Sequence, residues 1–253
     1  MAKIHGNAGE NAIDKGTRKQ ERLVAAIFGG GLLFMFACGV FLGLSFSRGA
    51  VLQGIAAVCT LTLLGIMFWL KKKVDSRIEK DIREVRYWRR GAEGEKVIAG
   101  VLETELSDKY HVFNDVCFPG RTSNIDHIVV GPSGVFVLNT KNWRGTVAWD
   151  GDGKTLLWNG EPDKWNSAKK AMADALNVRE KLRALLNREV FVKAILVFPL
   201  AKVVPKLDTP VELQQDDYLV GKRLKYIDKR NALSAKEVGE IANALLALFR
   251  ESV

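Results

Sequence analysis

Two charged side chains, Asp126 and Lys141, fall within neighbouring apolar segments that alternate as β-strands do. The alternation of "NIDHIVVG" (residues 124–131) places Asp126 on the apolar face, and that of "VFVLNTKN" (135–142) places Asn139 and Lys141 together on one face. Charged residues are scarce in strands, so these two must be paired, bound to a metal, or placed at the open end of the sheet. The spacing allows both a structural Asp126–Lys141 ion pair and a chemical site.

The tetrapeptide "GPSG" (131–134) joins the two segments and sets their register. Proline at its second position and glycine at its fourth are typical of a tight turn. A two-residue loop at Pro132 and Ser133 would place Asp126 directly opposite Asn139, whereas a bulge at Gly134 would shift the pairing by one residue. Both registers remain open at this stage.

The surrounding segments predict an α/β domain with a mixed sheet flanked by helices. A continuous apolar run at 190–198, bounded by Pro199, is typical of a strand buried on both faces. The final helix opens with Ser234 and carries Glu237 in the capping-box position. The other expected elements are a helix at 91–106, strands at 110–116, 146–149 and 155–158, a helix at 167–187 and a short strand through Tyr218 and Val220.

Two stretches without charged residues, 23–46 and 50–70, precede this domain. Their length predicts a two-helix transmembrane hairpin, and the alternative is a hairpin buried in a globular core. Basic residues flank both stretches, so the positive-inside rule predicts that both termini are cytoplasmic. We therefore expect a two-pass protein of the inner (cytoplasmic) membrane, with the lipid bilayer as a partner.

The chain accordingly divides into five predicted parts. A cytoplasmic tail covers 1–22 and the hairpin covers 23–70. A basic juxtamembrane stalk covers 71–90, and it would be either a short coiled coil that forms a homodimer or a helix on the membrane surface. The globular domain covers 91–200, and 201–253 is its C-terminal extension with the final helix. The net charge of +9 lies mostly in residues 1–90, whereas residues 91–253 are close to neutral, which argues against avid nonspecific binding of DNA.

The segments "GAEGE", "NIDHIVVGPSGVFVLNTKN" and "WRG" resemble the nuclease-related domain, NERD, a branch of the PD-(D/E)xK nuclease superfamily. The resemblance implies a restriction-endonuclease-like mixed β-sheet, cleavage of DNA or RNA, and Mg²⁺ (Mn²⁺ as a substitute) as the cofactor, with no small-molecule cofactor. By position, Glu95 matches the helix glutamate, Asp126 the strand aspartate and Lys141 the lysine that activates water. The metal ligands would be Asp126, Asn139 and Glu95.

Two departures from the family pattern weaken the expected metal site. Asn139 stands where the second carboxylate belongs, and "NSAKK" places Ser167 and Lys170 where the family often has proline and glutamine. Losing an anion and gaining a cation disfavour Mg²⁺ and favour a directly held phosphate.

The expected function is therefore a membrane-anchored nuclease-related protein that binds or cleaves nucleic acid through a weakened metal-dependent site. The alternative is an inactive nuclease fold that acts as a tethered scaffold or a module that binds phosphate or nucleic acid. Lys170, Trp143 and Arg144 are the expected substrate contacts. Trp149, Trp158 and Trp165 are expected to pack over the 146–158 hairpin, with a stacking platform as the alternative.

Overall fold

The computed structural model describes residues 1–45, 49–118, 123–206, 209–215, 222–226 and 232–250. The chain divides into two compact units, and the boundaries between them fall near the start of α1 (Glu10–Ser45) and within the long helix α2 (Ala50–Glu105). Unit 1 contains Met1–Ala12 and Arg90–Val253, and unit 2 contains Ile13–Arg89. Each unit is described below by itself.

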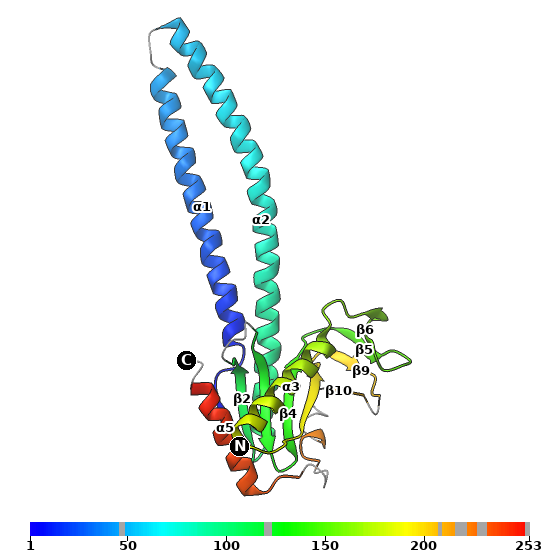
Figure 1. Cartoon of the computed structure of the whole chain (residues 1–253). Coiled ribbons are helices and arrows are strands. Elements are labelled where there is room, and N and C mark those ends of the chain that lie inside the picture. The colour runs from blue at the N-terminus through cyan, green and yellow to red at the C-terminus, as the bar shows by residue number, and fades with distance from the viewer. Residues whose placement is uncertain (46–48, 119–122, 207–208, 216–221, 227–231, 251–253) are drawn as a thin grey trace. The chain divides into compact units, whose positions relative to one another are not determined.

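Unit 1 is built around a mixed six-stranded sheet (Figure 1). The strand order is β1-β2-β3-β4-β8-β10, in which β2–β3 and β3–β4 pair antiparallel and the other neighbours pair parallel. Their bounds are β1 Lys3–His5, β2 His111–Val116, β3 Ile125–Gly131, β4 Gly134–Thr140, β8 Val192–Val197 and β10 Val211–Gln214.

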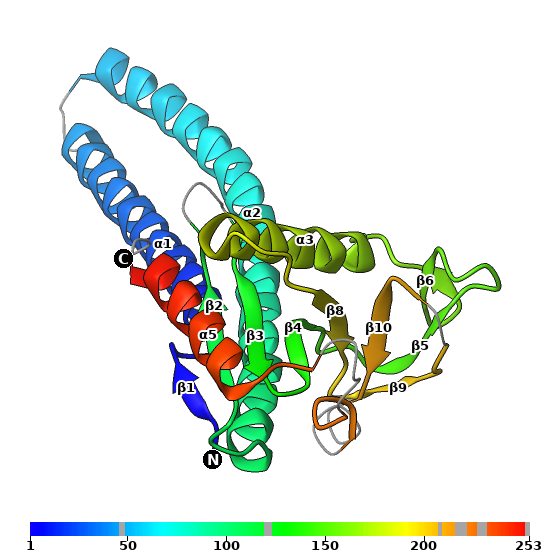
Figure 2. The same cartoon turned by 60° about the horizontal axis from the view of Figure 1, so that its bottom comes forward.

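A smaller sheet of order β7-β6-β5-β9 continues from the first one (Figure 2). Its strands are β5 Gly145–Trp149, β6 Leu156–Trp158, β7 Glu161–Pro162 and β9 Ala201–Val203. The parallel pair β4–β8 leads directly into the parallel pair β5–β9. Residues 141–144 therefore form a corner where the chain passes from one sheet to the other.

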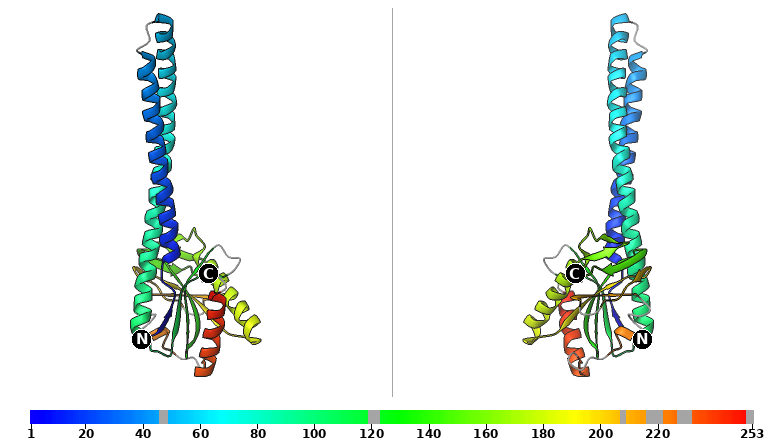
Figure 3. Two further views of the ribbon diagram at one scale, coloured as in Figure 1. Left: turned by 90° about the vertical axis from the view of Figure 1, so that its left-hand side faces the viewer. Right: turned by 90° about the vertical axis from the view of Figure 1, so that its right-hand side faces the viewer.

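Helices cover both faces of the large sheet, as the edge-on views in Figure 3 show. The end of α2 that belongs to unit 1 packs Ile98, Leu102 and Leu106 against one face. Helices α3 (Ser167–Leu186) and α5 (Ala235–Arg250) cover the other. The apolar side chains between these layers are buried, and β4 is buried along its whole length. The predicted mixed sheet flanked by helices agrees with this architecture.

The β3–β4 turn adopts the two-residue register. Gly131 pairs with Gly134, and His127 pairs with Leu138, so the same register brings Asp126 opposite Asn139. Gly134 has a φ of 124°, a value that a side chain would strain, which explains the glycine at the end of the turn. The capping box of α5 is also confirmed, because Ser234 N–H donates to Glu237 Oε2 (2.8 Å) and Glu237 N–H donates to Ser234 Oγ (3.3 Å).

Unit 2 consists of the greater part of α1 (Glu10–Ser45) and the part of α2 that precedes Arg90. Ion pairs join the two helices, since Lys19 Nζ contacts Asp81 (3.2 Å) and Glu84. Farther along α1, several large apolar side chains are exposed, among them Phe28 (71 %) and Leu32 (71 %).

The predicted transmembrane hairpin at 23–46 and 50–70 is wrong. Within the part of the chain that the structure describes, no helix combines enough length with enough apolar character to cross a membrane. This finding also contradicts the predicted two-pass inner-membrane localisation with cytoplasmic termini. The prediction relied on the absence of charge, but glycine, serine and threonine are uncharged and add little apolar side-chain area.

Several elements differ from the sequence-based expectation. No strand was expected in residues 1–22, but Lys3–His5 form β1, which pairs parallel with β2. The helix expected at 91–106 is the end of α2, which begins at Ala50. Strands β7, β9 and β10 were not expected, and the short strand predicted through Tyr218 and Val220 lies outside the described residues.

Candidate functional site

Three polar residues form a row across the middle strands of the large sheet. The pairs on either side of Asp115 and Asp126 in β2–β3 place these two residues opposite each other. The β3–β4 register places Asp126 opposite Asn139, and β8 continues the row with Leu196. The row lies near the end of the sheet where β2 and β4 finish and β3 begins. We call this end of the sheet, together with Glu95 of α2, the acidic edge.

Asp126 is held in place at the point where β3 and β4 part. Its Oδ2 accepts a hydrogen bond from the backbone N–H of Thr140 (2.6 Å), which orients the carboxylate. Burial raises the pKa of Asp126, while the charges of Lys141 and Lys170 and the Thr140 N–H oppose this rise, and Asp115 adds to it. The sequence left two registers open, and the observed one is the two-residue register that places Asp126 opposite Asn139.

Glu95 comes to the acidic edge from α2. It is only 8 % exposed, and its Oε2 is buried without a hydrogen-bond partner among the described residues. Burial raises its pKa to about 8, helped by the negative charges of Asp126 and Asp115; Lys141 and a hydrogen bond from the Gly9 N–H oppose the rise. Glu95 is therefore largely protonated at neutral pH. Its pKa responds to Asp126 and Lys141, so the three residues lie close enough to interact.

Asp115 is a third carboxylate of the acidic edge, and sequence reasoning missed it. It is 8 % exposed and has a φ of 56°, an uncommon conformation for a residue other than glycine. Its carboxylate accepts hydrogen bonds from the N–H (2.6 Å) and side-chain amide (3.1 Å) of Asn11 and from Asn124. The aspartate within the predicted strand 110–116 was the available signal.

Two lysines provide positive charge near these carboxylates. Lys141 lies at the corner after β4, where its N–H donates to the carbonyl of Val197 (2.8 Å). Among the described residues it makes no ion pair with Asp126 within 4.0 Å, so the simple structural pair is not formed. Its charge nevertheless favours the ionised forms of both Asp126 and Glu95, and Lys170 of α3 does the same for Asp126.

Asn139 is engaged with α3. The residue is 3 % exposed, and its Nδ2 donates to Oδ2 of Asp174 (3.0 Å), which is fully buried. The register places Asn139 in the row with Asp126, but this hydrogen bond directs its amide nitrogen to the helix. No signal in the sequence indicated that a buried aspartate of α3 would contact Asn139.

The two other predicted substrate contacts lie at the corner between the sheets. Trp143 is 8 % exposed, and its N–H donates to the carbonyl of Lys141 (2.8 Å). Arg144 is exposed, and its carbonyl accepts a hydrogen bond from Nε1 of Trp158 (2.7 Å). The corner therefore brings Trp143 and Trp158 next to Lys141 and Arg144 in the structure.

The fit of this site to a divalent cation is partial. The described residues contain no group of three or more histidine, cysteine, aspartate or glutamate side chains arranged to hold a metal ion. Mg²⁺, however, commonly takes one or two carboxylates and completes its shell with water. Glu95 and Asp126 supply two such groups, and the unpartnered Oε2 of Glu95 is suited to a cation. Asn139 does not complete the predicted set, because its amide nitrogen is bound to Asp174.

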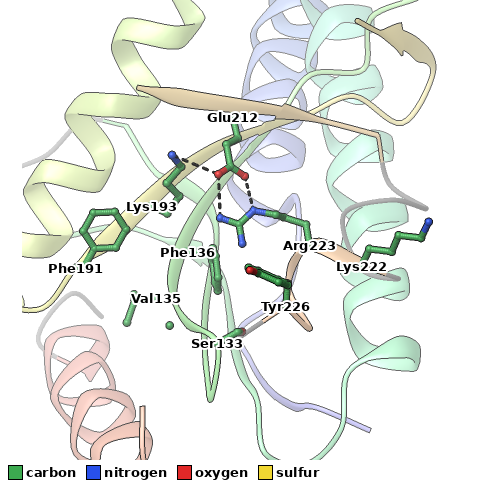
Figure 4. A pocket seen from close by; sticks show the side chains of 10 residues that line it. Ser133, Val135, Phe136, Phe191, Lys193, Glu212, Lys222, Arg223 and Tyr226 are labelled. Carbon is green, nitrogen blue, oxygen red and sulfur yellow. Dashed lines mark hydrogen bonds and ion pairs between the residues drawn. The ribbon is translucent and has the colours of Figure 1, made fainter. Parts of the chain in front are cut away.

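Two cavities of about 510 Å³ each lie away from the acidic edge. The first adjoins the β3–β4 turn and is shown in Figure 4, where Lys193 and Arg223 converge on Glu212. Arg223 binds Glu212 through two hydrogen bonds (2.6 and 2.9 Å), and Lys193 lies 3.3 Å from the same carboxylate. The second cavity shares these three residues, and none of the predicted site residues lines either cavity.

Comparisons with known proteins agree with the resemblance in the sequence. Residues 90–199 match the family model of the nuclease-related domain. An uncharacterized protein of Bacillus anthracis is 32 % identical over 101 residues, which are 39 % of this chain and 43 % of that protein. The chain thus spans less than half the length of this relative. No solved structure matches the chain.

Proposed function

We propose that the nuclease-related domain binds nucleic acid at the acidic edge and hydrolyses its phosphodiester bonds with a divalent cation held by Glu95 and Asp126. The observation that carries the proposal is the state of Glu95: a buried carboxyl with an unpartnered oxygen and a pKa of about 8, beside Asp126 and Lys141. Burying such a group without a partner lowers stability, and strongly perturbed carboxyls of this kind cluster at functional sites.

The residues of the acidic edge divide the chemistry among them. The bound cation would supply positive charge against the developing negative charge and lower the pKa of a bound water. Asp126, oriented by the Thr140 N–H, would provide a fixed negative oxygen, and Glu95 would release its proton when the cation binds. Lys141 and Lys170 contribute positive charge for the phosphate and for the attacking water.

Cleavage is tested with the full chain and end-labelled oligonucleotides in Mg²⁺ or Mn²⁺. We expect cleavage by the wild type and its loss in Asp126→Asn, which keeps the size of the side chain but removes its charge. Glu161→Gln, an exposed change in β7, is the control and should cleave normally. Absence of cleavage by the wild type, or equal cleavage by Asp126→Asn, would contradict the proposal.

A second candidate is binding of nucleic acid or phosphate without cleavage. The hydrogen bond between Asn139 and Asp174 favours it, because the position where a second carboxylate belongs carries no charge. Under this alternative the wild type binds oligonucleotides but leaves them intact with every cation. Asp126→Asn would then bind at least as tightly as the wild type, since removing an anion favours a phosphate.

A further inference from the structure

Trp165 is an exposed tryptophan supported from behind by other aromatic rings. Its ring lies 5.7 Å from Trp143 and 5.8 Å from Trp158, and those two rings stack at 4.8 Å with an angle of 23° between their planes. Trp143 in turn packs against the buried Phe198 at 5.5 Å. Trp165 itself is 54 % exposed, so a large part of its ring faces solvent.

The loop that carries Trp165 is fixed by the carboxylate of Asp163. Asp163 Oδ1 accepts a hydrogen bond from the Trp165 N–H (3.0 Å), and its Oδ2 accepts one from the Ser167 N–H (2.6 Å). Asn166, between them, has a φ of 52°. The exposed ring is therefore presented by an ordered backbone, so little conformational entropy remains to be lost when a ligand packs on it.

Trp165 also adjoins the acidic edge through two connections. Trp143, its neighbour in the cluster, donates a backbone hydrogen bond to Lys141 (2.8 Å). On the other side, α3 begins at Ser167 and carries Lys170, whose charge acts on Asp126. At the junction Ser167 is 2 % exposed, and its Oγ has no hydrogen-bond partner among the residues that the structure describes.

We propose that Trp165 stacks on an unpaired base of the nucleic-acid strand held at the acidic edge, so that the substrate is single-stranded or carries an unpaired nucleotide there. This inference rests on the proposed function. A base in a duplex is stacked on both faces, whereas an unpaired base offers a face to an aromatic ring. Because residues 91–253 are close to neutral, contacts with phosphates alone supply little affinity, and stacking provides the remainder.

The test measures binding of the full chain to one labelled sequence as single-stranded DNA, single-stranded RNA and blunt DNA duplex. Ca²⁺ is present in place of Mg²⁺ or Mn²⁺, and gels verify that the labelled strands stay intact, so no cleavage intervenes. Trp165→Leu keeps an apolar side chain but removes the ring, and it should weaken single-strand binding by roughly tenfold. Trp165→Tyr should remain within about threefold of the wild type. Duplex binding should be unchanged in both variants.

Phe191→Ala provides a matched control, because Phe191 is 56 % exposed in the same domain but lines the first cavity. It should bind all three ligands as the wild type does. Tryptophan fluorescence gives a second readout: single strands should quench the wild type, and Trp165→Tyr should lose most of that quenching.

The outcomes separate this inference from the proposed function. The stacking role is refuted if folded Trp165→Leu binds single strands as tightly as the wild type, or if it loses single-strand and duplex binding equally. Either result leaves the proposal of nucleolytic cleavage standing. Trp165-dependent binding without cleavage in Mg²⁺ or Mn²⁺ supports stacking and refutes hydrolysis. No binding of any nucleic acid would refute both.

Discussion

Two glutamates near the large sheet, Glu95 and Glu212, show opposite ways of handling a buried carboxylate. Glu212 lies beside the two cavities and is bound by Arg223 and Lys193, with its side chain 22 % exposed. Burial would raise its pKa, but these two cations overcome that effect and lower it. Glu95 is 8 % exposed, has an unpartnered oxygen, and burial raises its pKa to about 8.

The two regions differ in whether the cost of burying a carboxylate is compensated by paired cations. Pairing with Arg223 and Lys193 offsets the cost of burying Glu212. These ion pairs can therefore be explained by a structural role alone. Nothing in the described part of unit 1 does the same for Oε2 of Glu95, and Asp126 and Asp115 increase the cost. A fold retains such an arrangement where function requires it, which is why the proposed activity is assigned to the acidic edge.

The largest expected effect is on cleavage. Asp126→Asn should reduce the rate by at least about 100-fold, because even residues that only support a metal ligand typically contribute about 10- to 100-fold. Glu212→Gln, on β10 and separated from β4 by β8, should leave the rate within about twofold of the wild type. Gel assays of both variants measure this contrast. An equal loss in both variants would show that the acidic edge and the Glu212 ion-pair network are not functionally distinct.

Exchanging the donor and the acceptor of the Asn139–Asp174 hydrogen bond tests whether that bond stabilises the buried pair. Asn139→Asp alone brings a second carboxylate against that of the fully buried Asp174. This contact should destabilise the protein by about 2–3 kcal/mol. The exchange Asn139→Asp/Asp174→Asn restores one donor and one acceptor and should recover most of that loss. Urea unfolding measures both. If the exchange is no more stable than the single variant, the hydrogen bond is not what fixes this pair.

Removing the paired carboxylate should cost stability without affecting function. Glu212→Gln weakens charged hydrogen bonds to Arg223 and leaves Lys193 without its anion, at an expected cost of about 1–2 kcal/mol. Urea unfolding monitored by circular dichroism gives the value. An unchanged free energy of unfolding would mean that solvent already satisfies these cations.

Glu95 should also make the stability of the protein depend on pH. Its folded pKa of about 8 exceeds its ordinary value of 4.5, so its favourable contribution is complete below about pH 4.5 and is lost as pH rises through about 8. Glu95→Gln should avoid that loss and raise the melting temperature above pH 8 by roughly 2–4 °C per kcal/mol regained.

Calorimetric scans of Glu95→Gln and the wild type across this pH range test the sign. Glu212 has a lowered pKa, so its contribution must instead be lost as pH falls. A Glu95→Gln variant that is less stable than the wild type at high pH would contradict the unpaired state of Glu95.

Much of the sheet could be predicted, because local patterns determine it. Alternation in 124–131 and 135–142, with a proline and glycine turn between them, predicted two adjacent strands and left two registers open, one of which is observed. The capping box at Ser234 is equally local. In each of these cases the residues that make the contact lie close together in the chain.

What could not be predicted depends on contacts between distant segments or on how apolar a segment without charged residues is. Asp115 is bound by Asn11, 104 residues away, and nothing in the N-terminal segment announced that contact. Asp174 meets Asn139 only because α3 packs on that face of the sheet. The predicted membrane hairpin is wrong because a segment without charged residues is not necessarily apolar enough to cross a membrane.

The most direct test of the central claim is titration calorimetry of the full chain with Mn²⁺ at about pH 6.5 and about pH 8.5, on the wild type and Glu95→Gln. If the acidic edge holds a divalent cation, Glu95 must lose its proton on binding, so wild-type affinity should rise by roughly tenfold or more between these pH values. Glu95→Gln should bind weakly and lack most of this pH dependence. Wild-type affinity that is independent of pH and unchanged by Glu95→Gln would contradict a cation site at the acidic edge.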